Sequence, residues 1–196
     1  MEPTFKGYGG FPASVCASID DEIVHGIPSA DRVLREGEII SIDVGSTYEG
    51  YVSDAARTYP VGEVSEEAKK IIDAAEKSFF AGLEYCRPGN RISDISHAVQ
   101  SVAEKAGFGV IRNYVGHGVG HEMHEEPQIP NYGRPGRGPR IAKGMCLAIE
   151  PMITAGSYKC RTLDNDWTVV TEDGGLAAHY ENSVAVTDGE PELLTL

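Results

Sequence analysis

Long apolar runs are missing from this 196-residue sequence, and its N-terminus lacks the basic-then-apolar layout of a secretory signal peptide. Cysteine is also scarce, and the widely spaced cysteines form no CxxC pair, which disfavours a disulfide framework and a zinc knuckle. We therefore expect no membrane association and a reduced, cytoplasmic location. The cysteines are Cys16, Cys86, Cys146 and Cys160.

Basic residues are outnumbered by acidic ones. There are 17 lysines and arginines against 30 aspartates and glutamates, and the net charge of −13 lacks the basic footprint that nucleic-acid binding needs. We expect no sequence-specific nucleic-acid partner. One loop is locally basic, and we interpret it as a solvated surface loop, with a transient ribosome contact as the alternative. Its basic residues are Arg134, Arg137, Arg140 and Lys143.

Two helices are predicted in the middle of the chain. Residues 65–86 carry apolar residues at helical spacing, with Ser65 as N-cap and acidic residues in the first turn. A second helix is expected to start at Ser93 and to close at Gly107. Strand-like segments lie on both sides of this helical pair.

The order of these elements indicates the fold class. A strand pair, two helices and further strand pairs favour an α+β domain with helices on one face of a largely antiparallel sheet. Acidic residues occur in the strands before and after the helices, which would suit two pseudo-symmetric halves. With 41% hydrophobic residues, the chain suits one globular domain over residues 1–196, expected to be a monomer.

An aspartate pair is the first unusual feature. Residues 38–60 are expected to form a β-hairpin, which sets Asp43 directly opposite Asp54 if the loop is Thr47–Gly50. If the loop is shifted by one residue at both ends, the two are diagonal but still share a face. Like charges facing each other across strands are destabilising, and aspartate is a poor strand former, so this pairing needs an explanation.

Further ionisable residues interrupt apolar runs later in the chain. His117 sits between two glycines, where backbone can approach a ligand closely, and His124 follows seven residues on. Glu150 ends an apolar strand immediately before a proline, and Glu181 opens another strand. Charged groups in such runs are seldom buried unless they are paired or bind a metal.

Together these residues favour a metal site. Four carboxylates meeting in a dry site would repel one another, and divalent cations between them remove the repulsion. Bridging carboxylates commonly hold two metals ~3.5–4 Å apart. Oxygen donors with one imidazole suit Mn, Fe, Co or Zn better than Ca or Mg. Two divalent ions per chain are therefore expected.

Each residue also has a simpler interpretation. The two aspartates alone suit solvent-facing strand ends, and His117 alone suits a structural hydrogen bond. His97 is interpreted as surface or core filler, and His179 as a neighbour of the site that binds no metal. His121 is a candidate accessory contact. Only the combination makes the metal interpretation the stronger one.

Five ordered motifs resemble the type I methionine aminopeptidases across essentially the whole chain. They are "HGIP" (25–28), "SIDVG…SDAART" (41–58), "GHGVGHEMHEEPQIP" (116–130), "AIEPM" (148–152) and "HYENS" (179–183). The resemblance implies a pita-bread fold, in which two pseudo-symmetric halves enclose a dinuclear metal site. It also implies five metal ligands, two of which, Asp54 and Glu181, would bridge both ions. The five are Asp43, Asp54, His117, Glu150 and Glu181.

The implied reaction removes the initiator methionine from nascent polypeptides when the second residue is small. A hydroxide bridging the metals would attack the first peptide carbonyl, with Glu150 as proton shuttle to the leaving amine. His25 and His124 resemble the donors that position substrate and stabilise the oxyanion. The expected methionine pocket is lined by Tyr8, Phe11, Cys16, Met123 and Trp167.

The chain departs from the family pattern in several places. Members usually carry a further N-terminal segment before "GYGGFP", which this chain is expected to lack, and position 182 is asparagine where histidine is frequent. Xaa-Pro aminopeptidases and prolidases share the fold and ligands, but this chain is small for their extra domain. A non-catalytic relative used as a binding module would be expected to have lost a ligand.

Overall fold

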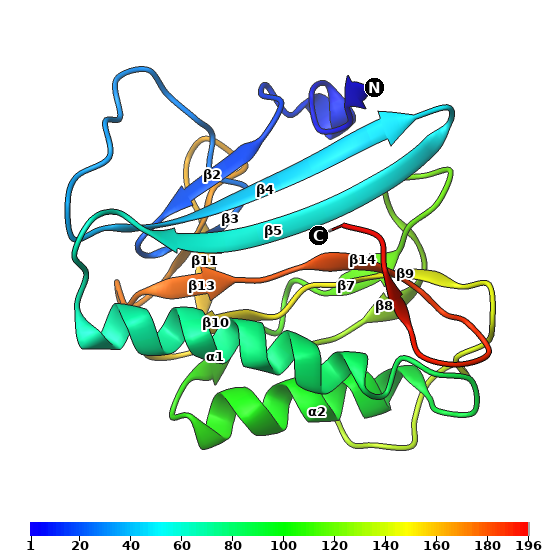
Figure 1. Cartoon of the computed structure of the whole chain (residues 1–196). Coiled ribbons are helices and arrows are strands. Elements are labelled where there is room, and N and C mark those ends of the chain that lie inside the picture. Colours follow the sequence, from blue (N-terminus) through cyan, green and yellow to red (C-terminus); the bar gives the residue numbers. More distant parts are fainter. Residues whose placement is uncertain (196) are drawn as a thin grey trace.

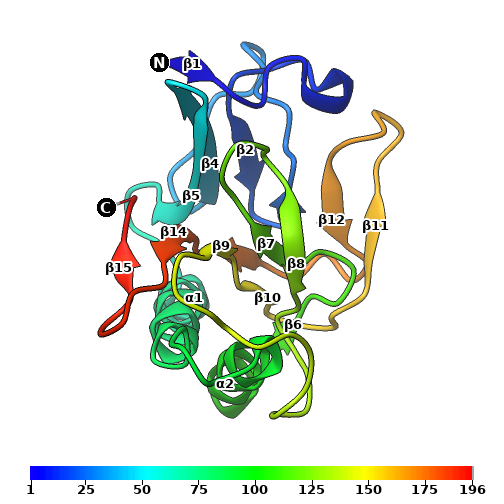
Figure 2. The same cartoon turned by 90° about the vertical axis from the view of Figure 1, so that its right-hand side faces the viewer.

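The computed structural model describes residues 1–195, in which two helices lie against one face of antiparallel sheets (Figures 1 and 2). The helices are α1 (Glu66–Leu83) and α2 (Ile92–Lys105), with a short 3₁₀ helix, η1 (Tyr8–Gly10), near the N-terminus. The strands before α1 are β1 (Glu2–Pro3), β2 (Cys16–Ile19), β3 (Glu22–Val24), β4 (Ile39–Tyr48) and β5 (Tyr51–Pro60). The strands after α2 are β6 (Gly109–Val110), β7 (Gly116–Gly118), β8 (Glu125–Ile129), β9 (Cys146–Ile149), β10 (Met152–Thr154), β11 (Cys160–Thr162), β12 (Val169–Thr171), β13 (Ala177–His179), β14 (Asn182–Ala185) and β15 (Glu192–Leu193).

Helix α1 begins as its sequence predicts. The Ser65 hydroxyl accepts a hydrogen bond from the Ala68 N–H at 3.1 Å, which satisfies one of the unpaired donors of the first turn. Ile71, Ala75 and Phe79 are buried on one side of the helix. The predicted N-cap and apolar face are therefore both confirmed.

Helix α2 starts one residue before the predicted Ser93. The first helical residue is Ile92, because the Asp94 carboxylate turns back and accepts the Arg91 N–H at 2.8 Å. At the other end Gly107 has φ of +91°, the left-handed conformation that commonly terminates a helix. The predicted end of this helix is confirmed, and its start is corrected by one residue.

The β4–β5 hairpin decides between the two predicted registers. Its loop is the two-residue Glu49–Gly50 turn, with φ of +50° and +82°, and it pairs Asp43 with Ala56 and Gly45 with Asp54. The directly opposed register is wrong. The diagonal register is correct, and it leaves Asp43 and Asp54 on the same face of the hairpin.

The core lies between the helices and the sheets beneath the central strands. In one cluster Phe79 of α1 and Val99 of α2 pack against Leu147 and Ile149 of β9. A second cluster joins Ile71 to the strands of the β13–β10–β6 sheet. Because the helices cover this face, the opposite face of β9, β13 and β14 is left for other contacts.

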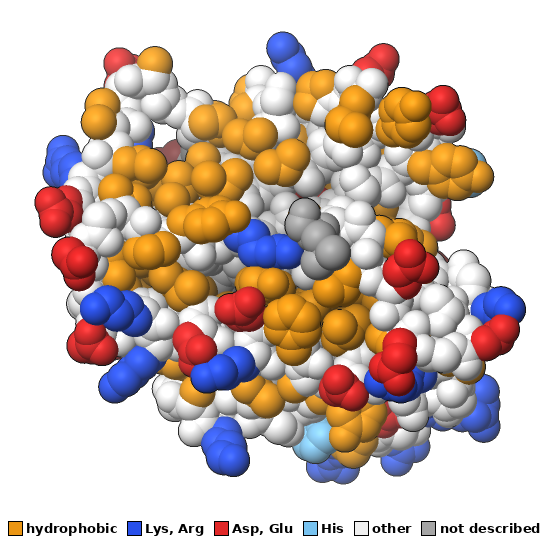
Figure 3. All heavy atoms as spheres, viewed as in Figure 1, with side chains coloured by type: hydrophobic (Ala, Val, Ile, Leu, Met, Phe, Trp, Pro, Cys, Tyr) orange, Lys and Arg blue, Asp and Glu red, His pale blue; other side chains and the backbone are white. Residues whose placement is uncertain are grey.

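The hairpin has a second face, which points away from these strands. Ile42, Val44, Tyr48 and Tyr59 alternate with the aspartates along β4 and β5 and are exposed. Apolar side chains gather on this side in the space-filling view (Figure 3). A sheet usually turns its apolar face to the protein interior and its polar face to solvent. In this hairpin the carboxylates face the interior and apolar side chains face solvent. That reversal requires a polar site on the inner face.

Candidate metal centre and substrate cavity

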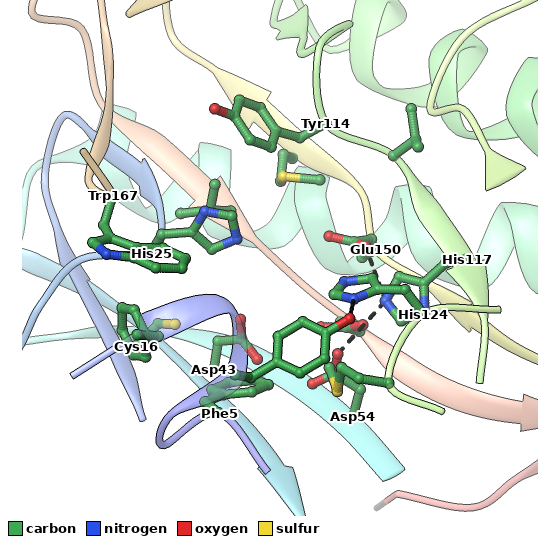
Figure 4. A pocket seen from close by; sticks show the side chains of 17 residues that line it. Phe5, Cys16, His25, Asp43, Asp54, Tyr114, His117, His124, Glu150 and Trp167 are labelled. Atoms are coloured by element: carbon green, nitrogen blue, oxygen red, sulfur yellow. Dashed lines mark hydrogen bonds and ion pairs between the residues drawn. The ribbon is translucent and has the colours of Figure 1, made fainter. Parts of the chain in front are cut away.

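The twelve residues predicted from the sequence to bind metal, act in catalysis or line the methionine pocket all line one cavity of about 180 Å³ (Figure 4), whereas His121, the candidate accessory contact, does not. Acidic groups and His117 gather at one side of the cavity, and aromatic and sulfur-containing side chains form much of the rest. The twelve are Tyr8, Phe11, Cys16, His25, Asp43, Asp54, His117, Met123, His124, Glu150, Trp167 and Glu181. The folded chain therefore brings together residues that are separated by up to 173 positions, from Tyr8 to Glu181.

A series of hydrogen bonds joins β5 to the segment that contains β13 and β14, and these bonds position Glu181. The Ser183 hydroxyl accepts the Asp54 N–H at 2.9 Å and donates to the Asp54 carbonyl at 3.0 Å. The backbone of Ala56 pairs with that of Glu181, with N···O distances of 2.9 and 3.4 Å. Thr58 repeats the hydroxyl pattern with the backbone of His179. These contacts bring the Glu181 carboxylate to the aspartate face of the hairpin.

Arg57 reinforces this junction from the other side. Its guanidinium donates to the carbonyl of Glu181 and, at 2.7 Å, to Oδ1 of Asn182. It also lies over the Tyr180 ring, 4.0 Å from the centroid. Asn182, where histidine is frequent among the resembling proteins, is thus held by a charge-assisted hydrogen bond next to Glu181.

His117 presents one definite nitrogen to the carboxylates. Its Nδ1–H donates to the Gly118 carbonyl at 2.8 Å, which leaves Nε2 to face the carboxylates. Burial lowers the pKa of His117, but the contacts with Asp54 and Glu150 outweigh this effect and raise it. That Nε2 lies 3.7 Å from Asp54 Oδ2 and 3.6 Å from Glu150 Oε1. Such a ring is oriented and prepared to bind a cation.

The glycines beside His117 are also needed for the packing of neighbouring strands. A Cβ at Gly116 would lie 2.4 Å from the Ala148 carbonyl, and one at Gly118 would lie 2.4 Å from the Glu126 carbonyl. Both contacts are with neighbouring strands of the sheet. The glycines therefore allow β7 to pack closely between β8 and β9, and the expectation that they also bring backbone close to a ligand stays a prediction.

Burial and mutual repulsion disfavour the charged forms of the acidic residues. Burial raises the pKa of Asp43 well above its usual value, and the charges of Asp54 and Glu150 add to the effect. Burial likewise raises the pKa of Glu181, with Asp54 and Glu150 again contributing. For Glu150 burial raises the pKa to about 8, against the opposing effect of His117. A bound cation would reverse this balance.

Unpaired oxygens make the metal interpretation specific. Asp43 Oδ1, Asp54 Oδ1 and Glu181 Oε1 are buried and have no hydrogen-bond partner among the described residues. Leaving such atoms unpaired is costly, whereas coordination would satisfy them. Two groups of donor atoms, sharing Glu181, have all members within 4.8 Å of one another: Asp54, His117 and Glu181, and Asp43, His179 and Glu181. The residues present therefore fit divalent cations.

His124 and Tyr8 form a pair at the mouth of the cavity. The Tyr8 hydroxyl lies 2.8 Å from His124 Nδ1, and the His124 ring lies 4.3 Å from that of His117. Burial lowers the pKa of His124, and the nearby His117 lowers it further, so the ring is neutral at neutral pH. A neutral imidazole of this kind can donate one hydrogen bond into the cavity.

His25 lies on the opposite side of the cavity from this pair. It has φ of +58°, and its ring contacts Tyr114 and Trp167 edge-on at centroid distances of 5.7 and 6.3 Å. Burial lowers the pKa of His25, which keeps the ring neutral. A non-glycine residue in the left-handed region stores strain, a feature that clusters at functional sites.

Aromatic and sulfur-containing side chains form the apolar wall of the cavity. Some of these residues were predicted from the sequence, and others were missed. Phe11 packs edge-on against Trp167 at 5.1 Å, and Cys16 and Met123 are buried in the same cluster. Burial and the neighbouring Asp43 raise the pKa of the Cys16 thiol, so this cysteine lines the wall as a neutral group. Of the residues that were missed, only Met152 lies in one of the quoted motifs, "AIEPM". The missed lining residues are Phe5, Val24, Tyr114, Val115 and Met152.

Three further histidines have distinct environments. His97 is exposed on α2 and its Nδ1 faces the Gly133 carbonyl at 3.2 Å, which agrees with the surface interpretation. His121 is exposed too, and donates through Nδ1 to the Gly50 carbonyl at 2.8 Å while stacking on Tyr51. His179 is buried beside the glutamates. Burial lowers the pKa of His179 to about 3.

Comparison with known proteins identifies relatives over the whole site. The model of metallopeptidase family M24 matches residues 3–188. A methionine aminopeptidase of Clostridium acetobutylicum is 61% identical over 194 residues, which are 99% of this chain and 78% of the relative. Methionine aminopeptidase 1 of Bacillus subtilis is 52% identical over 193 residues, or 98% of this chain and 77% of the relative.

Solved structures agree with these relatives. The methionine aminopeptidase of Thermotoga maritima has a TM-score of 0.97 at 46% identity, covering 99% of this chain and 78% of that one. A prolidase of Pyrococcus horikoshii has a TM-score of 0.72 at 22% identity, covering 93% of this chain and 47% of that one, and shares the fold alone. In residues 1–195 no helix is both long and apolar enough to cross a membrane.

Proposed function

The chain belongs to metallopeptidase family M24, among its methionine aminopeptidases, and from that premise we propose how its own residues remove an initiator methionine. It has the pita-bread fold of that group and is a metal-dependent aminopeptidase. The observation that carries the proposal is the cluster of buried, unpaired carboxylate oxygens at one side of a largely apolar cavity.

The metal ligands are proposed to be the five residues of the sequence motifs. Asp54 and Glu181 would each contribute to both of two ions, with Asp43 on one ion, and His117 and Glu150 on the other. Mn, Co, Fe(II) and Zn all suit this oxygen-rich donor set with an imidazole. When bound, such ions lower the pKa of a water and polarise a carbonyl, which is the chemistry needed to hydrolyse a peptide bond.

The side chains around the metals supply orientation and proton transfer. Glu150 is proposed to take up a proton on its carboxylate and to pass it to the leaving amine. His124 is proposed to donate a hydrogen bond to the developing oxyanion, and His25 to position the substrate from the opposite side. The neutral state of both rings supports these roles, because a neutral imidazole donates without adding a second cation.

The apolar part of the cavity suits a methionine side chain. A thioether favours aromatic and sulfur neighbours, and Phe11, Cys16, Met123 and Trp167 supply both. The half-buried Trp167 meets Phe11 and His25, which places it between the apolar wall and the histidine. The fifth proposed lining residue, Tyr8, also contacts His124. Limited room beyond the first residue would explain a preference for a small second residue.

The proposed substrates are the N-termini of nascent polypeptides, and the proposed location is the cytoplasm, where these carry their initiator methionine. The four free thiols support a reducing compartment. A ribosome contact through the basic loop, a monomeric state and a single domain over residues 1–196 stay predictions. One basic side chain of that loop, Lys143, already forms an ion pair with Asp188 of the same chain.

Peptide cleavage by the purified chain tests this function. The chain would be assayed without metal and then with Mn, Co or Fe(II), on peptides beginning Met-Gly, Met-Leu and Ala-Pro. We expect metal-dependent release of methionine from Met-Gly alone. Glu150→Ala should reduce this activity by at least about 100-fold, because it removes both a ligand and the proton carrier.

The other outcomes are equally informative. Cleavage of the Ala-Pro peptide would assign a prolidase-type activity instead. This activity is the main alternative because prolidases share the fold. Metal binding without turnover of any of the three peptides would contradict the enzymatic proposal.

A further inference from the structure

His179 has an unpaired nitrogen at the metal centre that none of the assigned roles uses. The residue is the last of β13, two positions before Glu181, and only 2% of its surface is exposed. Its Nε2 has no hydrogen-bond partner among the residues that the structure describes. A buried imidazole nitrogen without a partner is costly and calls for an explanation.

The surroundings of His179 match those of His117. His179 Nε2 lies 3.6 Å from Glu150 Oε2 and 3.7 Å from Glu181 Oε2. His117 Nε2 lies 3.6 Å from Glu150 Oε1 and 3.7 Å from Asp54 Oδ2. The two imidazoles therefore approach the two oxygens of one glutamate at equal distances, and each also meets a second carboxylate.

These distances are those of neighbouring ligands and not of hydrogen bonds. A hydrogen bond from a ring N–H to a carboxylate is expected at ~2.7–3.2 Å. Two donors bound at about 2.0–2.2 Å to one ion are separated by roughly 3.0–3.5 Å, depending on the coordination angle. The 3.7 Å from His179 Nε2 to Glu181 Oε2, a carboxylate proposed to contact both ions, needs only a small contraction around a shared ion.

The donor groups lead to the same conclusion. One group joins Asp54, His117 and Glu181, and the other joins Asp43, His179 and Glu181. Each group thus holds one hairpin aspartate and one histidine, and Glu181 is common to both. Without His179, the ion beside Asp43 would have oxygen donors only.

We infer that His179 is a sixth protein ligand, giving the ion held by Asp43 and Glu181 an imidazole nitrogen. This inference rests on the metal centre of the proposed function and extends it. The two ions would then have similar mixed nitrogen and oxygen donors, and the second site would favour Co or Zn over Mg more strongly than an all-oxygen site does.

The test counts imidazoles by X-ray absorption on the metal-stripped chain reloaded with two equivalents of Co(II). The variants are His179→Gln, His117→Gln as a chain lacking a motif ligand, and His97→Gln as a surface-histidine control. Titration calorimetry would measure both Co(II) affinities, and circular dichroism with thermal melting of the metal-free chains would check folding.

We expect two imidazoles for every two cobalt ions in the unaltered chain, and one in His179→Gln. The dissociation constant of the weaker cobalt ion should rise at least about tenfold in that variant. His97→Gln should change neither quantity. The count in the unaltered chain tests the inference even if His179→Gln fails to fold.

Two results would overturn the assignment of His179 alone. One is a single imidazole for every two ions in the unaltered chain. The other is an unchanged imidazole count in His179→Gln, even with weaker binding, since that combination describes a residue that only orients the ligands. An unaltered chain that binds no cobalt would instead overturn the metal centre, and with it the proposed function.

Discussion

The Tyr8 hydroxyl is placed to influence which nitrogen of His124 carries the proton. A Tyr8 hydroxyl that donates to Nδ1 at 2.8 Å leaves the proton on Nε2, and only that tautomer can donate a hydrogen bond from Nε2. If Tyr8 donates, we expect it to act on the reaction through His124, in addition to lining the pocket. The sequence pointed to both residues, but it contained no sign that they touch.

Removing either member of this pair tests the arrangement. We expect His124→Ala to lower kcat by about 10²–10³-fold, the typical effect of losing one oxyanion donor. Tyr8→Phe keeps the ring and loses only the proton-directing hydroxyl, so a fall of roughly tenfold in kcat with little change in KM is expected. Steady-state rates on a Met-Gly peptide measure both.

Phe5 provides a matched control, because it lines the cavity without a polar contact to His124. Phe5→Leu should act mainly on KM. Full activity of Tyr8→Phe would show that the hydroxyl does not orient His124.

At the scale of elements, the junction between β5 and the β13–β14 segment holds the two halves of the site together. Ser183 satisfies both the N–H and the carbonyl of Asp54, so one side chain substitutes for two backbone hydrogen bonds of a sheet. The junction could not be predicted from strand patterns, because its pairing uses hydroxyl groups from residues about 130 positions apart.

Ser183→Ala removes a single hydroxyl group, but we expect it to lower the free energy of unfolding substantially. It leaves the buried Asp54 N–H unpaired and the Asp54 carbonyl with only the longer contact to the Thr195 hydroxyl at 3.4 Å. The expected cost is about 1–3 kcal/mol in the free energy of unfolding. Metal affinity should fall as well, because Asp54 is no longer fixed against Glu181. Urea denaturation and cobalt titration measure the two effects.

Ser53→Ala is the appropriate control for this change. Ser53 lies next to Asp54 on β5, but its hydroxyl contacts that of Ser46 on the outer face of the hairpin at 3.0 Å. We expect this variant to stay within about 0.5 kcal/mol of the unaltered chain. Equal destabilisation by both variants would contradict a special role for the junction.

At the scale of the whole molecule, the buried acids make the stability depend on pH. The pKa of Glu150 is raised from 4.5 to about 8, so the metal-free folded state retains a proton that the unfolded state has lost between these values. Stability from this group is complete below pH 4.5 and disappears as the pH rises through 8. The raised pKa values of Asp43 and Glu181 act in the same direction.

We therefore expect the metal-free chain to melt at least about 5 °C lower at pH 9 than at pH 6. With saturating Mn or Co the order should reverse between pH 5 and pH 8, because metal ligands must be deprotonated. Thermal melting with and without chelator measures both trends. Glu150→Gln should flatten the metal-free trend, and a metal-free chain that becomes more stable towards pH 9 would show that the buried acids do not control it.

Local chemistry and residue order were enough to determine much of this protein. Ser65 identified the start of α1, because N-capping depends on neighbours in the chain. The carboxylates and His117 identified a metal site, because charged groups in apolar runs are seldom buried unless they are paired or bind a metal. The ordered motifs also carried the family, and with it the pita-bread fold and the aminopeptidase activity.

Only the tertiary structure decided the features that depend on contacts between distant segments. The two-residue Glu49–Gly50 turn chose the diagonal register of the aspartates, although either register satisfied the sequence. Gly116 and Gly118 proved to serve strand packing, because the carbonyls that crowd them come from other strands. The sequence places His179 beside the site, but the 3.6 Å from its nitrogen to Glu150 exists only in the folded chain, because the two residues are 29 positions apart.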